Sequence, residues 1–230
     1  MTAPAAAAKG GPAGHSPPDD RPPRLDAKAL RCTHGGPFDM AVRAGECVAV
    51  LGRSGIGKSV LLRMIADLDP HAGEVWLDGR PRASWPAPAW RAQVVYQAAE
   101  PAWWAPTPAE HMGGASEAVL GGLLDRLGLA PAVLQAELDR LSTGERQRLA
   151  LVRSLARRPR VLLLDEPTAS LDEASTLAVE GLLADALQRD GLAIVLVTHS
   201  RAQAHRLADR LVWLDAPPAG AAPAIAAFPA

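Results

Sequence analysis

Residues 52–59 read GRSGIGKS and directly follow Cys47–Leu51, an apolar run with the length of a buried strand. The next stretch, Lys58–Leu68, has a helical period, and its apolar face consists of Leu61, Leu62, Ile65 and Leu68. A glycine-rich turn between strand and helix lets backbone amides converge on an anion, and the helix dipole points at the same anion. The segment therefore predicts a phosphate-binding loop in an α/β fold.

The loop matches the pattern G-x-x-x-x-G-K-[ST], in which the last two residues have defined partners. Lys58 reaches the β- and γ-phosphates of a nucleotide, and a planar arginine would not replace its compact ammonium. The Ser59 hydroxyl is a predicted ligand of Mg²⁺. The predicted nucleotide contacts are Gly52, Arg53, Ser54, Gly55, Ile56, Gly57, Lys58, Ser59 and Val60.

Two later apolar runs, Val161–Leu164 and Ile194–Val197, consist of uninterrupted β-formers. Such runs are typical of parallel strands that are covered on both faces. Asp165 follows the first run, where an anion is costly unless a cation such as Mg²⁺ supplies the counter-charge. Glu166 is one residue further on, and we expect it to be the general base that orients a water molecule.

Helical patterns account for most of the remaining chain. Ser142 and Glu145 have the spacing of a capping box, which predicts a helix running to about Arg158. A helix over Ala174–Gln188 would join the two apolar strands as a β-α-β crossover. Between 99 and 140 the sequence predicts a short inserted helical subdomain with helical patterns at Ser116–Leu127 and Pro131–Leu138.

Composition limits the partners that the chain is expected to have. The formal net charge of −1 suggests no polyanion-binding surface, so no nucleic-acid partner is expected. The apolar runs are far shorter than the ~20 residues of a membrane-spanning helix, so a membrane role requires a partner chain. Residues 1–24 are rich in Ala, Pro and Gly and predict a disordered arm, and 216–230 predict a flexible tail.

The chain resembles the ATP-binding subunit of an ABC transporter from about Leu25 to Asp215. The resemblance is carried, in chain order, by GRSGIGKS (52–59), LSTGE (141–145), VLLLDEP (161–167), SLD (170–172) and THS (198–200). It implies a P-loop NTPase core at 25–98 and 141–215, with an antiparallel β subdomain and the helical subdomain 99–140. ATP and Mg²⁺ are then the expected cofactors.

The same resemblance implies that two copies of the chain form a homodimer around two ATP molecules. The signature residues Ser142, Thr143, Gly144 and Glu145 would face the nucleotide of the opposite protomer. Asp172 of the SLD segment would cross the same interface, and His199 would contact the γ-phosphate. With Lys58 and Glu166, His199 completes the expected catalytic set.

Several positions depart from the family pattern. Val60 stands where a second hydroxyl residue is usual, and Thr143 replaces a glycine. The usual glutamine two residues before a proline is absent, because Ala99 holds that position before Pro101. Either Gln97 takes its role through a register shift, or Glu100 substitutes, or the contact is lost. For adenine stacking, Phe38 fits a core position better, which leaves His34 as a candidate.

The expected function is ATP hydrolysis that energises a separate membrane permease, with the subunit held at the cytoplasmic face of the inner membrane. RAQVVYQAAEP (Arg91–Pro101) and DEPTASLDEAS are similar to the small ATP-binding subunit of bacterial iron-export ABC systems, which suggests iron or another metal as exported cargo. Trp103, Trp104 and Pro106 are either a docking patch for the permease or subdomain core. The alternative is a soluble or regulatory ABC ATPase with weak turnover.

Overall fold

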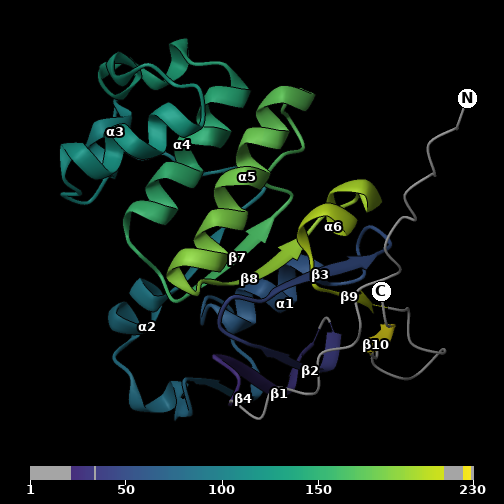
Figure 1. Cartoon of the computed structure of the whole chain (residues 1–230). Coiled ribbons are helices and arrows are strands. Elements are labelled where there is room, and N and C mark those ends of the chain that lie inside the picture. The colour runs from purple at the N-terminus through teal and green to yellow at the C-terminus, as the bar shows by residue number, and fades with distance from the viewer. Residues whose placement is uncertain (1–21, 34, 215–224, 229–230) are drawn as a thin grey trace, which may run out of the picture.

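The computed structural model describes residues 22–33, 35–214 and 225–228 as an α/β fold with two sheets (Figure 1). The larger sheet has six strands in the order β10-β9-β3-β8-β7-β6, and β10 alone runs antiparallel to its neighbour. Its strands are β3 (Cys47–Gly52), β6 (Val94–Gln97), β7 (Val161–Asp165), β8 (Ala193–Val197), β9 (Arg210–Leu214) and β10 (Ile225–Phe228).

Both faces of the central strands β3, β7 and β8 are buried, as the uninterrupted apolar runs predict. Alternate residues of β7 face different cores: Leu163 packs with helix α1 (Lys58–Ile65) and the smaller sheet, whereas Leu162 and Leu164 pack under the other helices. Figure 1 shows these helices above the sheet and the smaller sheet below it. They are α3 (Glu117–Arg126), α4 (Thr143–Ala156) and α5 (Glu173–Asp190).

The smaller sheet is antiparallel and has the strand order β2-β1-β4-β5. Leu25 of β1 pairs with Val42 of β2 on one side and with Leu77 of β4 on the other. These residues are buried against the larger sheet. The predicted antiparallel subdomain is confirmed, with strands β1 (Leu25–Cys32), β2 (Gly35–Val42), β4 (Ala72–Leu77) and β5 (Arg80–Pro81).

Four of the five predicted helical stretches form α-helices, with changes at their ends. α4 begins after Ser142 as the capping box predicts, and α5 covers the expected crossover. Pro131–Gln135 forms only a 3₁₀ turn where a helical pattern is expected, because this segment is followed by extended backbone at Ala136. The last helix, α6 (Arg201–Leu207), follows β8.

Three parts of the chain differ from the sequence-based expectation. α1 ends at Ile65 rather than Leu68, because Asp67 has a positive φ of 59°, and Leu68 is consequently 42% exposed. Residues 225–228 lie inside the expected flexible tail, yet they form β10 and pair with β9. Helix α2 (Ala87–Gln93) is not predicted by the proline-rich sequence around it.

The described residues include no helix that is long and apolar enough to span a bilayer. The expected disordered arm lies almost wholly outside the described residues. The division at 25–98, 99–140 and 141–215 stays a prediction.

Trp90 is the residue that anchors α2. Its side chain is fully buried, and its indole nitrogen donates a hydrogen bond of 3.1 Å to the Ile65 carbonyl at the end of α1. We expect Trp90→Ala to lower the free energy of unfolding by about 3–5 kcal/mol, because it leaves a cavity and an unpaired carbonyl. Urea unfolding measures this change. Trp104→Ala is the control: that side chain is 73% exposed, so a change of about 0.5 kcal/mol or less is expected, and equal losses would contradict the assignment.

Candidate nucleotide site

Three neighbouring parallel strands end at the same edge of the larger sheet, and the predicted site residues follow those ends. β3 leads into the loop 52–59, β7 ends at Asp165, and β8 leads to Thr198 and His199. The register pairs Val197 with Val50 on one side and with Asp165 on the other. The carboxyl ends of parallel strands are where open α/β sheets bind ligands.

The loop has the backbone of a phosphate cradle. Gly52 has a φ of 151°, and a Cβ at that position would lie 2.8 Å from the Leu214 carbonyl oxygen. Gly57 has a φ of 105° and precedes α1, whose N-terminus has no side-chain cap. The first amides of α1 are therefore available to an anion.

Lys58 lies across the loop rather than in solvent. Its Nζ donates to the carbonyl oxygens of Gly52 at 2.8 Å and Arg53 at 3.0 Å, and the residue is only 7% exposed. Burial lowers the pKa of Lys58, while the negative charges of Glu166 and Asp165 oppose that shift. An anionic phosphate would supply the stronger counter-charge that this buried ammonium lacks.

Asp165 is buried, with 5% of the residue exposed, and its Oδ2 accepts a hydrogen bond of 3.1 Å from the Tyr96 hydroxyl. Burial and the neighbouring carboxylate raise the pKa of Tyr96, so the hydroxyl keeps its proton and donates it. Asp165 and the exposed hydroxyl of Ser59 offer the oxygen ligands that Mg²⁺ prefers. The residues present therefore fit the expected ion.

Glu166 and His199 form a pair at the edge of the site. Oε1 of Glu166 lies 3.3 Å from Nε2 of His199, and Oε2 accepts a hydrogen bond of 3.3 Å from the His199 backbone amide. Oε1 is buried and accepts no well-formed hydrogen bond within the described residues. Burial raises the pKa of Glu166, and His199 partly opposes the shift. A half-buried carboxylate with a raised pKa suits a general base.

Two buried glutamines that the sequence analysis does not single out lie near this pair. Gln147 of α4 is buried, and its Nε2 donates to the Glu166 carbonyl at 3.2 Å. Gln203 of α6 donates to the Thr168 hydroxyl at 2.8 Å. Each glutamine lies on the buried face of its helix, and nothing in the neighbouring sequence distinguishes it from an ordinary buried side chain.

The signature segment and the SLD segment lie against each other. Ser142 and Glu145 form the predicted capping box, with a bond of 2.9 Å from the Ser142 amide to the Glu145 carboxylate. A Cβ on Gly144 would lie 3.4 Å from the Leu171 side chain, an ordinary van der Waals distance, so this end of α4 lies beside the SLD segment. Asp172 caps α5 by accepting a bond of 2.7 Å from the Ser175 amide. Thr143 is exposed at the same end of α4.

The departures from the family pattern have local explanations. Val60 is half-buried and packs against the core between the two sheets. Gln97 is 3% exposed and faces α4, where its Oε1 accepts a bond of 3.2 Å from Ser154, so in this structure it points away from the loop. The choice among Gln97, Glu100 and a lost contact stays open. Phe38 is fully buried as expected, and His34 lies outside the described residues.

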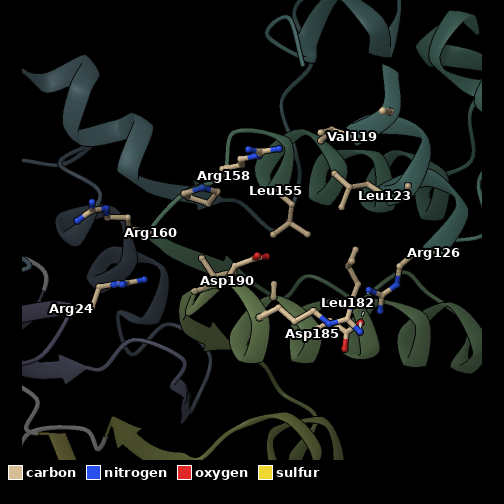
Figure 2. Close-up of a pocket in the computed structure, with 16 residues that line it drawn as sticks. Arg24, Val119, Leu123, Arg126, Leu155, Arg158, Arg160, Leu182, Asp185 and Asp190 are labelled. Atoms are coloured by element: carbon tan, nitrogen blue, oxygen red, sulfur yellow. Dashed lines mark ion pairs between the residues drawn. The ribbon is translucent and has the colours of Figure 1, made fainter. Parts of the chain in front are cut away.

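Two pockets accompany these features. One, of about 450 Å³, borders the Glu166–His199 pair and is lined by Glu166, Thr168, Ala169, Thr176, Thr198, His199, Ser200 and Gln203. Another, of about 910 Å³, lies between α3, the end of α4 and α5 (Figure 2). Figure 2 shows Asp185 beside Arg126 at its edge, and the two form an ion pair of 2.6 Å. None of the predicted nucleotide contacts lines this second pocket.

Comparison with known proteins supports the same reading. A family model described as "ABC transporter" matches residues 36–169. The aliphatic sulfonates import ATP-binding protein SsuB of Ralstonia nicotianae is 40% identical over 188 residues, which cover 77% of this chain and 63% of that protein. The Fe(3+) ions import ATP-binding protein FbpC 1 of Rhodococcus jostii is 37% identical over 186 residues, which cover 76% of this chain and 54% of that protein. The chain thus spans less than two thirds of the length of these relatives.

Solved structures share the fold. One described as an ATP-binding subunit of an ABC transporter has a TM-score of 0.73 and 27% identity, covering 82% of this chain and 85% of that one. The dimeric, post-hydrolysis structure of the ATP-binding cassette MJ0796 with ADP and Pi has a TM-score of 0.74 at 23% identity, covering 83% and 94%. At that identity the second likeness concerns the fold alone.

The raised pKa of Glu166 has a consequence for stability without nucleotide. The folded state disfavours the ionised Glu166 carboxylate, so ionisation lowers the free energy of unfolding. This loss of stability is absent below the ordinary pKa of 4.5 and grows as the pH rises through the raised pKa. We expect Glu166→Gln to raise the thermal midpoint at pH 8 and to have less effect as the pH approaches 4.5. Differential scanning fluorimetry measures both.

Glu145→Gln is the matched control with the opposite sign. Hydrogen bonds from Ser142 lower the pKa of Glu145, so its ionised form stabilises the fold at pH 8 and that stabilisation is lost as pH falls through the lowered pKa. A lower midpoint is therefore expected for this variant at pH 8. If both glutamine variants moved the midpoint in the same direction, the electrostatic assignment of Glu166 would be wrong.

Proposed function

The chain belongs to the ABC transporter family, and from that premise we propose that it binds and hydrolyses ATP to energise a separate membrane permease. The observation that carries the proposal is the convergence of five side chains at one edge of the larger sheet. They are Lys58, Ser59, Asp165, Glu166 and His199. Each has the chemistry that one part of a phosphate-transfer site requires.

In this proposal the loop amides and Lys58 hold the phosphates of ATP, while Ser59 and Asp165 hold Mg²⁺. Bound Mg²⁺ would offset the negative charge of the phosphates. Glu166 orients a water molecule and accepts its proton as the water oxygen bonds to the γ-phosphorus. The bond between the γ-phosphorus and the bridging oxygen breaks, which releases ADP and inorganic phosphate. His199 lies beside the base, where it can also reach the γ-phosphate.

We propose that two copies of the chain complete two such sites. Within the described residues, no hydrogen bond or ion pair joins Ser142–Glu145 to the loop 52–59 of the same chain. A head-to-tail homodimer would place this signature opposite the partner's nucleotide, with the α4 N-terminus directed at the phosphate. Asp172 would lie in the same interface, because it follows Leu171, whose side chain lies beside Gly144.

The proposed permease contact involves the segment after β6. Trp104 is 73% exposed, which suits a docking patch. Trp103 is half-buried and packs on the helical core, which suits the alternative of subdomain core. The buried His111 accepts hydrogen bonds from the amides of Trp104 at 2.9 Å and Ala105 at 3.2 Å, and Arg153 lies 5.3 Å from the Trp104 ring centroid. An exposed tryptophan on an ordered loop has the properties of an interface anchor. Docking there would hold the subunit at the cytoplasmic face of the inner membrane.

The transported cargo is addressed by the names of the relatives. The relatives are named for the import of aliphatic sulfonates and of Fe(3+) ions, so neither metal export nor a single cargo class follows from them. Iron export therefore rests on the sequence resemblance alone. Uptake and accumulation of radiolabelled alkanesulfonate and iron in a deletion strain would separate the classes.

A regulatory ATPase with weak turnover is the second candidate, and Val60, Thr143 and the inward-facing Gln97 favour it. The two functions differ in their dependence on the permease. Turnover by the purified chain, compared with turnover by the chain and its permease in lipid vesicles, distinguishes a transport subunit from an uncoupled regulator.

Glu166→Gln is expected to bind ATP with near-normal affinity and to lower the turnover number by about 10²–10⁴-fold, because it removes only the proton acceptor. Phosphate release and equilibrium ATP binding measure the two effects. Lys58→Ala should instead lose ATP binding, because it removes the buried ammonium. Unchanged turnover in Glu166→Gln would show that another group is the base.

Trp104→Ala is expected to weaken binding of the permease by at least about tenfold, or 1.4 kcal/mol, as truncation of an interface anchor does. Basal ATP hydrolysis by the isolated chain should be unchanged. Co-purification from lipid vesicles measures the first and phosphate release the second. The control is Trp76→Ala in β4, a half-buried tryptophan outside the proposed patch. Equal permease binding by wild type and Trp104→Ala would exclude this patch.

A further inference from the structure

We propose that Tyr96 is a positioning residue that orients the Asp165 carboxylate toward Mg²⁺. The inference rests on the proposed function, since it assigns Asp165 to the ion of the bound nucleotide. It concerns a residue to which the sequence analysis assigns no role.

The strand register brings the two side chains together. β6 and β7 are parallel neighbours, with Tyr96 paired to Leu163 and Gln97 paired to Leu164. Tyr96 and Leu163 contribute to the same core, so both point to the face of the sheet that carries α1. Asp165 is two residues beyond Leu163 and, because strands alternate, points to that face as well. Tyr96 is therefore the diagonal neighbour of Asp165, and its long side chain spans the gap.

The contact constrains one oxygen of the carboxylate. The Tyr96 hydroxyl donates to Oδ2 of Asp165 at 3.1 Å. Asp165 is only 5% exposed, and the bond to Oδ2 restricts the rotation of its carboxylate. In the proposal, Oδ1 is thereby left to bind Mg²⁺. The next residue, Gln97, points to the opposite face and bonds to Ser154, so it does not share this task in the present structure.

The hydroxyl can be tested separately from the ring. Tyr96 is the only tyrosine of the chain, and its ring is half-buried in the core between the sheets. Tyr96→Phe keeps that packing and removes the single donor to Asp165. A positioning role then predicts a defect in the response to Mg²⁺, whereas a packing role predicts a change in stability alone.

The experiment is an Mg²⁺ titration of nucleotide binding by the full chain, with the β,γ-imido analogue of ATP as the ligand and calorimetry as the readout. For Tyr96→Phe we expect the Mg²⁺ concentration for half-maximal enhancement of binding to rise on the order of tenfold, which corresponds to one hydrogen bond to a charged group. Binding in EDTA should equal that of wild type. Saturating Mg²⁺ should restore the turnover number.

Ser84→Ala is the control, because it removes a hydroxyl that bonds to Arg80 and Pro81 outside the nucleotide loop. It should titrate with Mg²⁺ as wild type does. The inference is overturned if Tyr96→Phe also titrates like wild type, if it only lowers the thermal midpoint, or if it weakens binding equally in EDTA. Failure of wild type to bind the analogue at all would overturn the proposed function instead.

Discussion

The parallel pairing of β3, β8 and β7 is the constraint on which the rest of the molecule depends. It places the loop 52–59, Asp165 and His199 at one edge although they are far apart in the chain. Because both faces of the sheet are buried, the register is strictly specified. A slip of one residue in β7 would turn Asp165 from the α1 side into the core beneath α4 and α5. Packing of ordinary aliphatic residues therefore sets the geometry of the charged ones.

Lys58 and Glu166, at that edge, lie in surroundings that disfavour their ionised forms. Burial lowers the pKa of Lys58 and raises that of Glu166, so each ionised form is disfavoured relative to water. Lys58 compensates with two loop carbonyls, and Glu166 with the backbone amide and ring of His199. Groups held in this way gain most from a ligand that brings the missing charges, as ATP with Mg²⁺ would. The charges at this edge are thus electrostatically suited to the nucleotide that we propose for it.

Two other surfaces of the chain suit the contacts with second chains that we propose. The signature helix has its capping box satisfied internally, and its Gly144 lies beside Leu171 of the SLD segment. Neither segment contacts the loop 52–59 through a hydrogen bond or ion pair within the described residues. Trp104 is similarly ordered by His111 and left exposed. These segments have a defined conformation and leave surface for a second chain, as the proposed dimer and permease contacts require. Fold and function are linked here through surfaces that a second chain would cover.

Sequence by itself determined those features whose signals are local. The glycine loop, the buried apolar strands, the capping box at Ser142 and Glu145, and the acidic pair after β7 can all be recognised within a few residues, because φ angles, burial and caps depend on near neighbours. Tertiary structure alone decided which side chains meet across strands. Tyr96 reaches Asp165, Gln97 turns to Ser154, and Gln147 holds the Glu166 backbone only because separate elements pack in one register. Helix α2 likewise depends on the burial of Trp90 against α1, a contact between distant parts of the chain.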